Sequence, residues 1–407
     1  MSTTASYPLL EALAKVGDFR KARGKRHPLA AILALACAAA LCGASSLTAM
    51  SQWGRHHGQE LLARLGFTHF PGPSTATLCR IFSQLDVAAL EQALTQWWQT
   101  WLPAHGGLAL DGKTVRGSRQ GSQDALQLLA AFATELRVVL AERAISNGDE
   151  IATALALLEG LDLSGWIVTG DAKLTQKKLV STIIEQHGDY VLTVKDNQPT
   201  LVDDIATLFN DPKVVAETIT TTRRIDLHGS RIEVRALAAA SALTAEYCGW
   251  PGLQQVFRIE RHRIDKRTGE RTIKVHFGIS SLSAERADAK RLAAINRGHW
   301  GIENDLHWVR DVDFGEDASR IHKGKAPQVM AVFRNIAVSL LGVLGYDSPI
   351  EGLRHFAWNS AEAVKLVISR PILAASATLK WVYSKLVHLV RRRVIAAAPT
   401  GVRQVSA

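Results

Sequence analysis

The chain has 407 residues, of which 47% are hydrophobic and 21% are charged. Since a domain commonly has about 150 residues, this length predicts two or three domains with a sizeable core. The composition excludes a mostly disordered chain and a fibrous repeat. Lys and Arg number 48 against 38 for Asp and Glu, and this excess favours a polyanionic partner such as nucleic acid over a membrane, although a solvated basic surface gives the same balance. The four cysteines form no C-x-x-C pair, so we expect neither disulfides nor a cysteine zinc site, in keeping with a reducing cytosol.

Residues 1–104 are helical in pattern and predict a separate N-terminal domain. The alanine-rich apolar run over 29–41 is too short for a membrane span and begins too late for a typical signal peptide, so we expect a buried helix. Ser74 or Thr75 is expected to cap a helix that runs to about residue 85, and Asp86 to cap the next one. These two helices suit a helix-turn-helix DNA reader, and equally a plain helical packing module.

The pattern changes at Gly107 to short apolar runs. These runs predict buried strands at 108–110, 126–133, 137–141, 166–168 and 190–194, with helices at 151–161 and 173–187. Between about 213 and 283 apolar and polar residues alternate, which predicts antiparallel strands at 218–225, 231–237, 255–264 and 271–279. We therefore predict a mixed α/β layer that begins over 105–212 and is interrupted by a β-rich insertion over 213–283.

Helical patterns return at Ala284 and are expected to complete this layer over 284–345. A helical, basic C-terminal region is expected over 346–407, with a helix at 371–394 that ends in Arg391, Arg392 and Arg393. This triple arginine predicts either a phosphate-binding patch or a solvated helix end.

Two aspartates each follow an apolar run in the predicted sheet. Asp111 follows 108–110 and Asp171 follows 167–170, and the carboxyl ends of strands face the crevice in which α/β proteins bind ligands. Farther along, a helix over 296–308 would place His299, Glu303 and His307 on one face at four-residue steps. If this face lies over the sheet, three carboxylates converge there.

Converging carboxylates repel one another unless a cation lies between them, and oxygen ligands suit Mg²⁺ or Mn²⁺. Two such ions about 4 Å apart can activate water and stabilise the leaving oxygen in a displacement at phosphorus. Lys113, Arg116 and Lys173 lie beside the aspartates and would attract a phosphodiester backbone. Taken singly, however, an Asp after a strand is more often a turn former or helix cap, and Glu303 could be an ordinary surface acid.

Three strings of residues resemble, in order, the motifs of the H-repeat-associated insertion-sequence DDE transposases. Leu-Asp-Gly-Lys-Thr-Val-Arg-Gly-Ser at 110–118 is similar to the first-aspartate motif, and Gly-Asp-Ala at 170–172 with Val-Lys-Asp-Asn-Gln at 194–198 to the second. His-Trp-Gly-Ile-Glu-Asn at 299–304, followed by Leu-His-Trp at 306–308 and the acids of 311–317, resembles the glutamate motif. The resemblance covers nearly the whole chain. It implies a ribonuclease-H-like core interrupted by a β-rich insertion, after an N-terminal domain that helps to bind terminal inverted repeats.

The same resemblance implies that Asp111, Asp171 and Glu303 hold two Mg²⁺ or Mn²⁺ ions, with no covalent protein–DNA intermediate. Water would attack a phosphodiester at the transposon end, and the released 3′-hydroxyl would then attack target DNA. The implied partner is double-stranded DNA, both inverted repeats and target, without a membrane. A homodimer on DNA, in the bacterial cytoplasm at the nucleoid, is the implied working form.

The expected DNA contacts are Lys113, Arg116, Lys173, Lys195, Arg297, His299, Trp300 and Arg310. Many related transposases carry a tyrosine and an arginine before the glutamate and a lysine seven positions after it. Here Asn296, His299 and Arg310 stand at those positions, so this chain departs from the wider group, and Arg297 is an alternative basic contact. Trp300 is the tryptophan we expect to stack on an unpaired base, whereas core packing is the simpler role for most others, including Trp97 and Trp98.

Two other functions fit parts of this pattern. A domesticated relative could bind DNA without cutting it, but the complete acidic set favours an intact enzyme. A zinc hydrolase could be built on His299, Glu303 and His307. Their H-x-x-x-E-x-x-x-H spacing is not the H-E-x-x-H of such enzymes, so we rank this alternative low, and DNA or supporting contacts are the simpler roles for both histidines.

Overall fold

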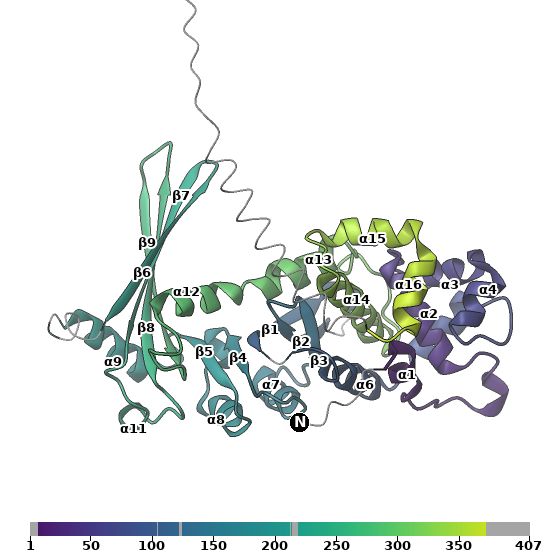
Figure 1. Ribbon diagram of the computed structural model, residues 1–407, viewed down its shortest axis with the longest axis horizontal. Coiled ribbons are helices and arrows are strands. Elements are labelled where there is room, and N and C mark those ends of the chain that lie inside the picture. The colour runs from purple at the N-terminus through teal and green to yellow at the C-terminus, as the bar shows by residue number, and fades with distance from the viewer. Residues whose placement is uncertain (1–6, 104, 122–123, 212, 214–218, 372–407) are drawn as a thin grey trace, which may run out of the picture.

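The computed structural model describes residues 7–103, 105–121, 124–211, 213 and 219–371, and these form a helical end, a central sheet and a projecting β arm (Figure 1). The helical end begins with α1 (Leu9–Ala14), the short turn η1 (Ala22–Gly24), α2 (Leu29–Leu41), α3 (Leu47–His56), α4 (Gly58–Arg64), α5 (Thr75–Phe82) and α6 (Val87–Gln99). Three helices from the other end of the chain, α14 (Ala326–Val343), α15 (Pro349–Trp358) and α16 (Ser360–Ile368), pack against α2. The two ends of the described chain therefore share one core.

The predicted helix starts at Ser74 and Asp86 are confirmed by their capping hydrogen bonds. The Ser74 hydroxyl accepts a bond from the Thr77 N–H at 3.3 Å, and the Asp86 carboxylate accepts one from the Ala89 N–H at 3.1 Å. Each bond satisfies an amide that has no partner within its own helix.

The alanine-rich helix α2 lies in the centre of the helical end. All of its residues except Ala30 are buried, as the sequence predicts, because small side chains let the surrounding helices approach closely. Among the described helices, only α14 is long and apolar enough to cross a membrane, and 89% of that stretch is buried inside the protein. Burial of this kind is typical of the core helix of a folded domain.

A single sheet runs through the described part of the chain, with nine strands in the order β3-β2-β1-β4-β5-β9-β8-β7-β6. The strands are β1 (Gly106–Val115), β2 (Leu126–Ala133), β3 (Val138–Ala144), β4 (Trp166–Gly170), β5 (Asp189–Val194), β6 (Thr220–His228), β7 (Arg231–Ala240), β8 (Gln255–Asp265) and β9 (Arg271–Ser280). Strands β1 to β3 are antiparallel, whereas β4 and β5 run parallel to β1. This mixed sheet confirms the predicted α/β, ribonuclease-H-like fold class.

Strand β1 is longer than the sequence predicts. Only its apolar start was expected, but β1 pairs with β2 from Leu108 to Val115. Asp111 therefore lies within the strand, opposite Ala130, and the prediction that it ends the strand was wrong. The parallel partner β4 pairs only with Gly106 to Ala109, so Asp111 still lies just beyond the carboxyl end of the parallel ladder.

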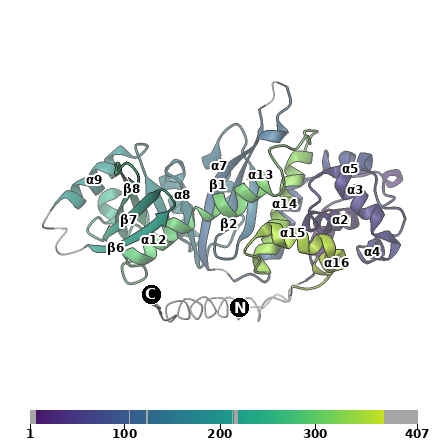
Figure 2. The same cartoon turned by 90° about the horizontal axis from the view of Figure 1, so that it is seen from above.

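Helices cover both faces of the central strands. On one side lie α6, α7 (Glu150–Leu158) and α8 (Lys177–Glu185), with the short turns η2 (Arg116–Ser118) and η3 (Ala172–Leu174) at strand ends. On the other side, one long helical path made of α12 (Ala289–Gly298), η4 (Ile302–His307) and α13 (Trp308–Val312) crosses from the arm to the core (Figure 2). Helix α14 runs along the edge strand β3, where the Ser339 hydroxyl accepts a hydrogen bond from the Val139 N–H at 2.9 Å.

The four strands predicted in the insertion are confirmed as β6 to β9, each somewhat longer than expected. They are not a separate sheet, because β9 pairs antiparallel with β5 from Val191 to Val194. The helices α9 (Pro199–Asn210) and α11 (Ala245–Cys248) lie at the base of this arm (Figure 1).

The chain beyond residue 371 lies outside the described residues. The helix predicted over 371–394 and the triple arginine Arg391, Arg392 and Arg393 therefore stay predictions. The predicted domain boundaries at 104, 212, 283 and 345 are likewise predictions.

Candidate functional site

The two predicted aspartates lie level with each other on neighbouring parallel strands. Ala109 of β1 pairs with Thr169 of β4. Asp111 follows Ala109 by two positions, and Asp171 follows Thr169 by two positions. Two positions return a strand to the same face, and neighbouring strands are about 4.8 Å apart. Asp111 and Asp171 therefore leave the sheet on one face, toward the path of α12 and η4.

Glu303 and His307 reach Asp111 from the helix that crosses this face. Nδ1 of His307 lies 3.4 Å from an Asp111 carboxylate oxygen and 3.8 Å from a Glu303 carboxylate oxygen. One potential ligand atom from each of the three side chains lies within 4.8 Å of the others. The structure thus brings together two of the three predicted acids, and adds His307.

The helix is not regular at this point. Residues Ile302–His307 form a π-helical turn, in which hydrogen bonds span five residues. The regular helix expected over 296–308 is thus interrupted, although His299, Glu303 and His307 all still face the sheet. The imidazole of His299 instead contacts the Thr169 hydroxyl at 3.1 Å, and His299 is not part of the set of ligand atoms around Asp111. The three-residue arrangement that a zinc hydrolase would need is not formed by these side chains.

Asp171 lies next to this cluster but outside the set within 4.8 Å. It is exposed, and its carboxylate accepts a hydrogen bond from the Leu174 N–H at 3.2 Å, which caps the turn η3. Its charge still reaches the cluster, because it is one of the causes that raise the pKa of Asp111. Asp171 thus has the helix-capping role that is the ordinary one for an Asp after a strand, at a place where it also faces the site.

The electrostatics of the cluster favour a bound cation. Burial raises the pKa of Asp111 to about 6; His307 opposes this rise, and the charges of Glu303 and Asp171 add to it. The hydrogen bond from His307 lowers the pKa of Glu303 below its ordinary value. Carboxylate oxygens with one imidazole nitrogen are donors that a divalent ion such as Mg²⁺ or Mn²⁺ accepts. The residues present therefore fit a divalent metal site.

A buried ion network holds the far end of the helical path against the sheet. Arg310 of α13 is 0% exposed and is paired with Glu142 of β3 and with Glu316, which lies 2.9 Å away. Arg334 of α14 also binds Glu316, at 2.9 Å. Because Arg310 has no access to solvent, the prediction that it contacts DNA was wrong.

Lys113 belongs to the same network. Its side chain is 8% exposed and its ammonium lies 2.6 Å from both carboxylate oxygens of Asp311. The prediction that Lys113 contacts DNA is corrected in the same way, because its charge is satisfied inside the protein. Lys113 therefore connects the end of β1 to α13 through Asp311, which lies four residues after His307.

Several other predicted DNA contacts are exposed. Trp300 is 58% exposed, and Lys195, Arg116, Lys173 and Arg297 are exposed as well. Arg116, Lys173 and Arg297 also have carboxylate partners, in Asp317, Glu150 and Asp226. The side chains of Trp97 and Trp98, by contrast, are each 1% exposed and pack in the core, as expected.

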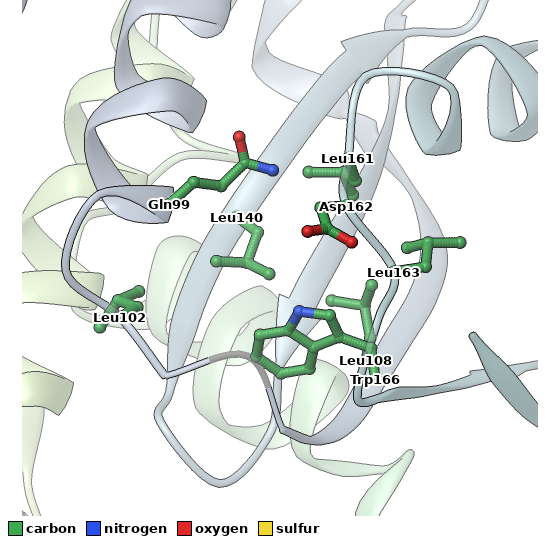
Figure 3. Close-up of a pocket in the computed structure, with 8 residues that line it drawn as sticks. All are labelled: Gln99, Leu102, Leu108, Leu140, Leu161, Asp162, Leu163 and Trp166. Carbon is green, nitrogen blue, oxygen red and sulfur yellow. The ribbon is translucent and has the colours of Figure 1, made fainter. Parts of the chain in front are cut away.

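The cavity shown in Figure 3 is separate from this cluster. It is lined by Gln99, Leu102, Leu108, Leu140, Leu161, Asp162, Leu163 and Trp166. Leu108 and Asp111 are three positions apart on one strand, so their side chains point to opposite faces of the sheet. The cavity thus lies on the other side of the sheet from the carboxylates and offers one acid only.

Sequence reasoning placed His307 on the same face as Glu303, but it did not anticipate the contact of His307 with Asp111 or the partners of Arg310. The signal for the network was an acid, Glu142, directly after the apolar run 138–141, since a buried carboxylate needs a cationic partner. The four-residue step from Glu303 marked His307, but no local signal revealed its approach to Asp111, which is nearly 200 residues away in the sequence.

Comparison with known proteins relates the N-terminal helical segment and the sheet-containing segment of the chain to transposases. Residues 103–340 match the family described as "Transposase DDE domain", and residues 10–98 match the one described as "DDE_Tnp_1-associated". "Putative transposase YncI" of Escherichia coli O157:H7 is 32% identical over 349 residues, which are 82% of this chain and 87% of that protein. "H repeat-associated putative transposase YhhI" of Escherichia coli K12 is 28% identical over 350 residues, 82% of this chain and 90% of that protein. A solved structure of piggyBac transposase in a synaptic complex with hairpin DNA aligns with 99% of this chain and 88% of its own, at 11% identity and a TM-score of 0.40.

Proposed function

Since the chain belongs to the DDE transposase family, with H repeat-associated relatives, we propose that it cuts the ends of its insertion sequence and joins the 3′-hydroxyl ends to target DNA. The observation that carries this proposal is the meeting of Asp111, Glu303 and His307, with Asp171 level with Asp111 on the next strand. Segments separated by nearly 200 residues supply these groups, and the carboxylates remain accessible, since Asp171 and Glu303 are exposed and Asp111 is half-buried.

In this proposal Asp111, Asp171 and Glu303 hold two divalent ions. When bound there, such ions would supply Lewis-acid polarisation of the phosphodiester and activation of the attacking water or hydroxyl. The protein's own residues supply position. The π-helical turn aims Glu303 and His307 at Asp111, and the buried ion network behind them fixes that helix against β1 and β3.

DNA recognition is assigned to the exposed groups around the cluster. Lys195, Lys173 and Arg116 would attract the phosphate backbone, and Trp300 would stack on a base unpaired near the cleaved end. His299 and Arg297 lie on the same helical path, one turn or more before Glu303. The working form is proposed to be a homodimer that holds two ends of the element in the bacterial cytoplasm.

The test is cleavage and joining of labelled DNA. Purified protein is incubated with a duplex that carries the element's terminal inverted repeat, a plasmid target and Mg²⁺, beside the variants Asp111→Asn, Asp171→Asn and Glu303→Gln. We expect nicked and joined products from the unchanged protein and from the control Asp162→Asn, whose carboxyl lines the cavity on the opposite face. None of the three site variants should give product.

Two results would contradict the proposal. Binding of the terminal duplex without any Mg²⁺- or Mn²⁺-dependent product would favour the non-catalytic relative. Equal product from Asp171→Asn and the unchanged protein would remove Asp171 from the metal site.

A further inference from the structure

The projecting arm carries more than half of the net positive charge of the chain. Its strands and turns, residues 220–240 and 255–280, hold eleven Lys and Arg residues against five Asp and Glu. This net charge of +6 compares with +10 for the entire chain, although these segments make up only 47 of the 407 residues. The catalytic cluster uses none of these residues.

Strand pairing sorts this charge onto two faces. Leu237 of β7 and Phe257 of β8 pack toward Leu292 of α12. Every second residue along a strand points to the same face, so the face of the arm that carries Leu237 and Phe257 is called its helix side. On the opposite face the distal positions include four exposed apolar residues, Ile225, Leu227, Ile273 and Val275. The two faces therefore differ in chemistry.

On the helix side, four cations stand in one row across all four strands. Arg224 pairs with Arg235, Arg235 with Arg261, and Arg261 with Lys274. Like charges directly opposite each other destabilise a sheet. At strand spacings of about 4.8 Å the row covers roughly 14 Å. A row of this kind is costly in the free protein and becomes favourable when an anion with several charges lies across it.

The neighbouring acids hold the arginines in place without neutralising them. Asp226 binds Arg224, Arg235 and the helix residue Arg297 at 2.8 to 3.0 Å. Glu233, which is 1% exposed, contacts Arg231, Arg235 and Arg261 at 2.7 to 3.2 Å. Hydrogen bonds from Arg297 and Arg224 lower the pKa of Asp226 to about 2, so it stays ionised. Two carboxylates thus order five guanidinium groups, which leaves an excess of positive charge in a fixed arrangement.

The row is connected to the catalytic cluster. Arg297 lies on α12, six residues before Glu303, and its bond to Asp226 fixes the arm against the helical path that carries Glu303 and His307. Helix α12 runs from the arm toward the core (Figures 1 and 2). A polyanion lying on the helix side of the arm would therefore be guided along α12 toward the carboxylates.

We infer that the helix side of the β6–β9 arm, with Arg224, Arg235, Arg261 and Lys274 as its central row, is a binding surface for the phosphate backbone of duplex DNA. The inference rests on the proposed function, because it names the surface that holds the DNA next to the reacting end. Duplex DNA carries one negative charge per about 1.7 Å of its axis, so the row faces several phosphates at once. The contacts are to phosphates, so the surface contributes affinity and alignment but no sequence preference.

The experiment compares two double variants of equal charge on the two faces of the same arm. Arg263→Gln with Lys274→Gln removes two exposed charges from the helix side, and within the described chain neither residue has an ion-pair partner. Arg223→Gln with Arg271→Gln removes two exposed charges from the opposite face. Thermal melting of both proteins first checks that the fold is intact. Binding of a fluorescein-labelled 30-base-pair duplex is then measured between about 50 and 200 mM salt.

For the helix-side variant we expect the slope of log K against log salt to become less negative by about 1.8, which is two contacts at about 0.9 each. The opposite-face variant should keep the slope of the unchanged protein, and two unrelated duplex sequences should give the same result. Equal slopes in both variants, or a loss restricted to one sequence, would overturn the inference.

The same proteins separate this inference from the proposed function. If the unchanged protein binds with the expected slope but gives no product with Mg²⁺, the proposed reaction fails and the surface stands. If it gives product while the helix-side variant retains its slope, the surface fails and the reaction stands. Absence of any duplex binding overturns both.

Discussion

Replacing Arg310 with methionine tests the buried ion network. The guanidinium of Arg310 is 0% exposed and is bound by Glu142 and Glu316, both buried. Burial by itself would lower the pKa of Arg310, but these two carboxylates raise it overall above its ordinary value, so the side chain is charged. In Arg310→Met, Glu316 keeps Arg334 as a partner, whereas Glu142 loses the one cation that pairs with it in the described part of the chain.

An uncompensated buried charge of this kind costs about 3–5 kcal/mol of unfolding free energy. With an m-value of about 3 kcal/mol per molar urea, the unfolding midpoint should fall by roughly 1–2 M. Equilibrium unfolding in urea, followed by tryptophan fluorescence, measures this shift. Adding Glu142→Gln to Arg310→Met should recover part of the loss, because the orphaned charge is then gone.

The matched control is Arg320→Met, since Arg320 is exposed and its replacement should change stability by no more than about 0.5 kcal/mol. If Arg310→Met and Arg320→Met unfold at the same urea concentration, the reasoning about the network is refuted. A loss of DNA affinity without a loss of stability would instead restore the original prediction that Arg310 contacts DNA.

Two further variants test other parts of the fold. Burial raises the pKa of Glu91 to about 8, and the Glu91 carboxylate accepts a hydrogen bond from Gln328. Because the pKa is higher in the folded than in the unfolded protein, the unchanged protein loses stability as the pH rises toward 8, so Glu91→Gln should become more stable relative to it from about pH 5 to about pH 8. Thermal melts over this range measure the difference, and a constant difference would contradict the prediction. A Cβ at Gly278 would lie 2.1 Å from Cζ of Phe257 and 2.7 Å from the Leu192 carbonyl oxygen. Gly278→Ala should therefore lower the unfolding free energy by about 1–3 kcal/mol. The control is Gly229→Ala, where the new Cβ has no atom within 4 Å, and this variant should melt like the unchanged protein.

Local patterns predicted the elements that local chemistry determines. Alternation of apolar and polar residues predicted the four arm strands. The hydroxyl of Ser74 and the carboxylate of Asp86 predicted the starts of two helices. Strand β1 was predicted too short because the apolar run ends at Asp111, and Gly112 and Lys113 after it also read as residues outside a buried strand. Lys113 is nevertheless buried in the strand. Its burial depends on Asp311, a partner nearly 200 residues later, which no local pattern reveals.

The candidate site divides in the same way. The positions of Asp111, Asp171 and Glu303 were available from the family resemblance, whereas the geometry between them depends on pairing between distant segments. A four-residue step along a regular helix predicted that His299, Glu303 and His307 share one face. The structure has a π-helical turn at Ile302–His307, and His299 contacts Thr169 of β4 without joining the ligand atoms around Asp111. Arg310 reads as a helix-surface residue until Glu142 and Glu316 are placed around it.

The pairing of Ala109 with Thr169 limits how this gene can change in length. A single-codon insertion or deletion between the pair and either aspartate would turn that carboxylate to the far side of the sheet. The turn after Gly269, whose neighbourhood is open, can gain or lose codons freely. Length variation among natural copies of this element should therefore accumulate in such turns and be absent from the two residues before Asp111 and Asp171.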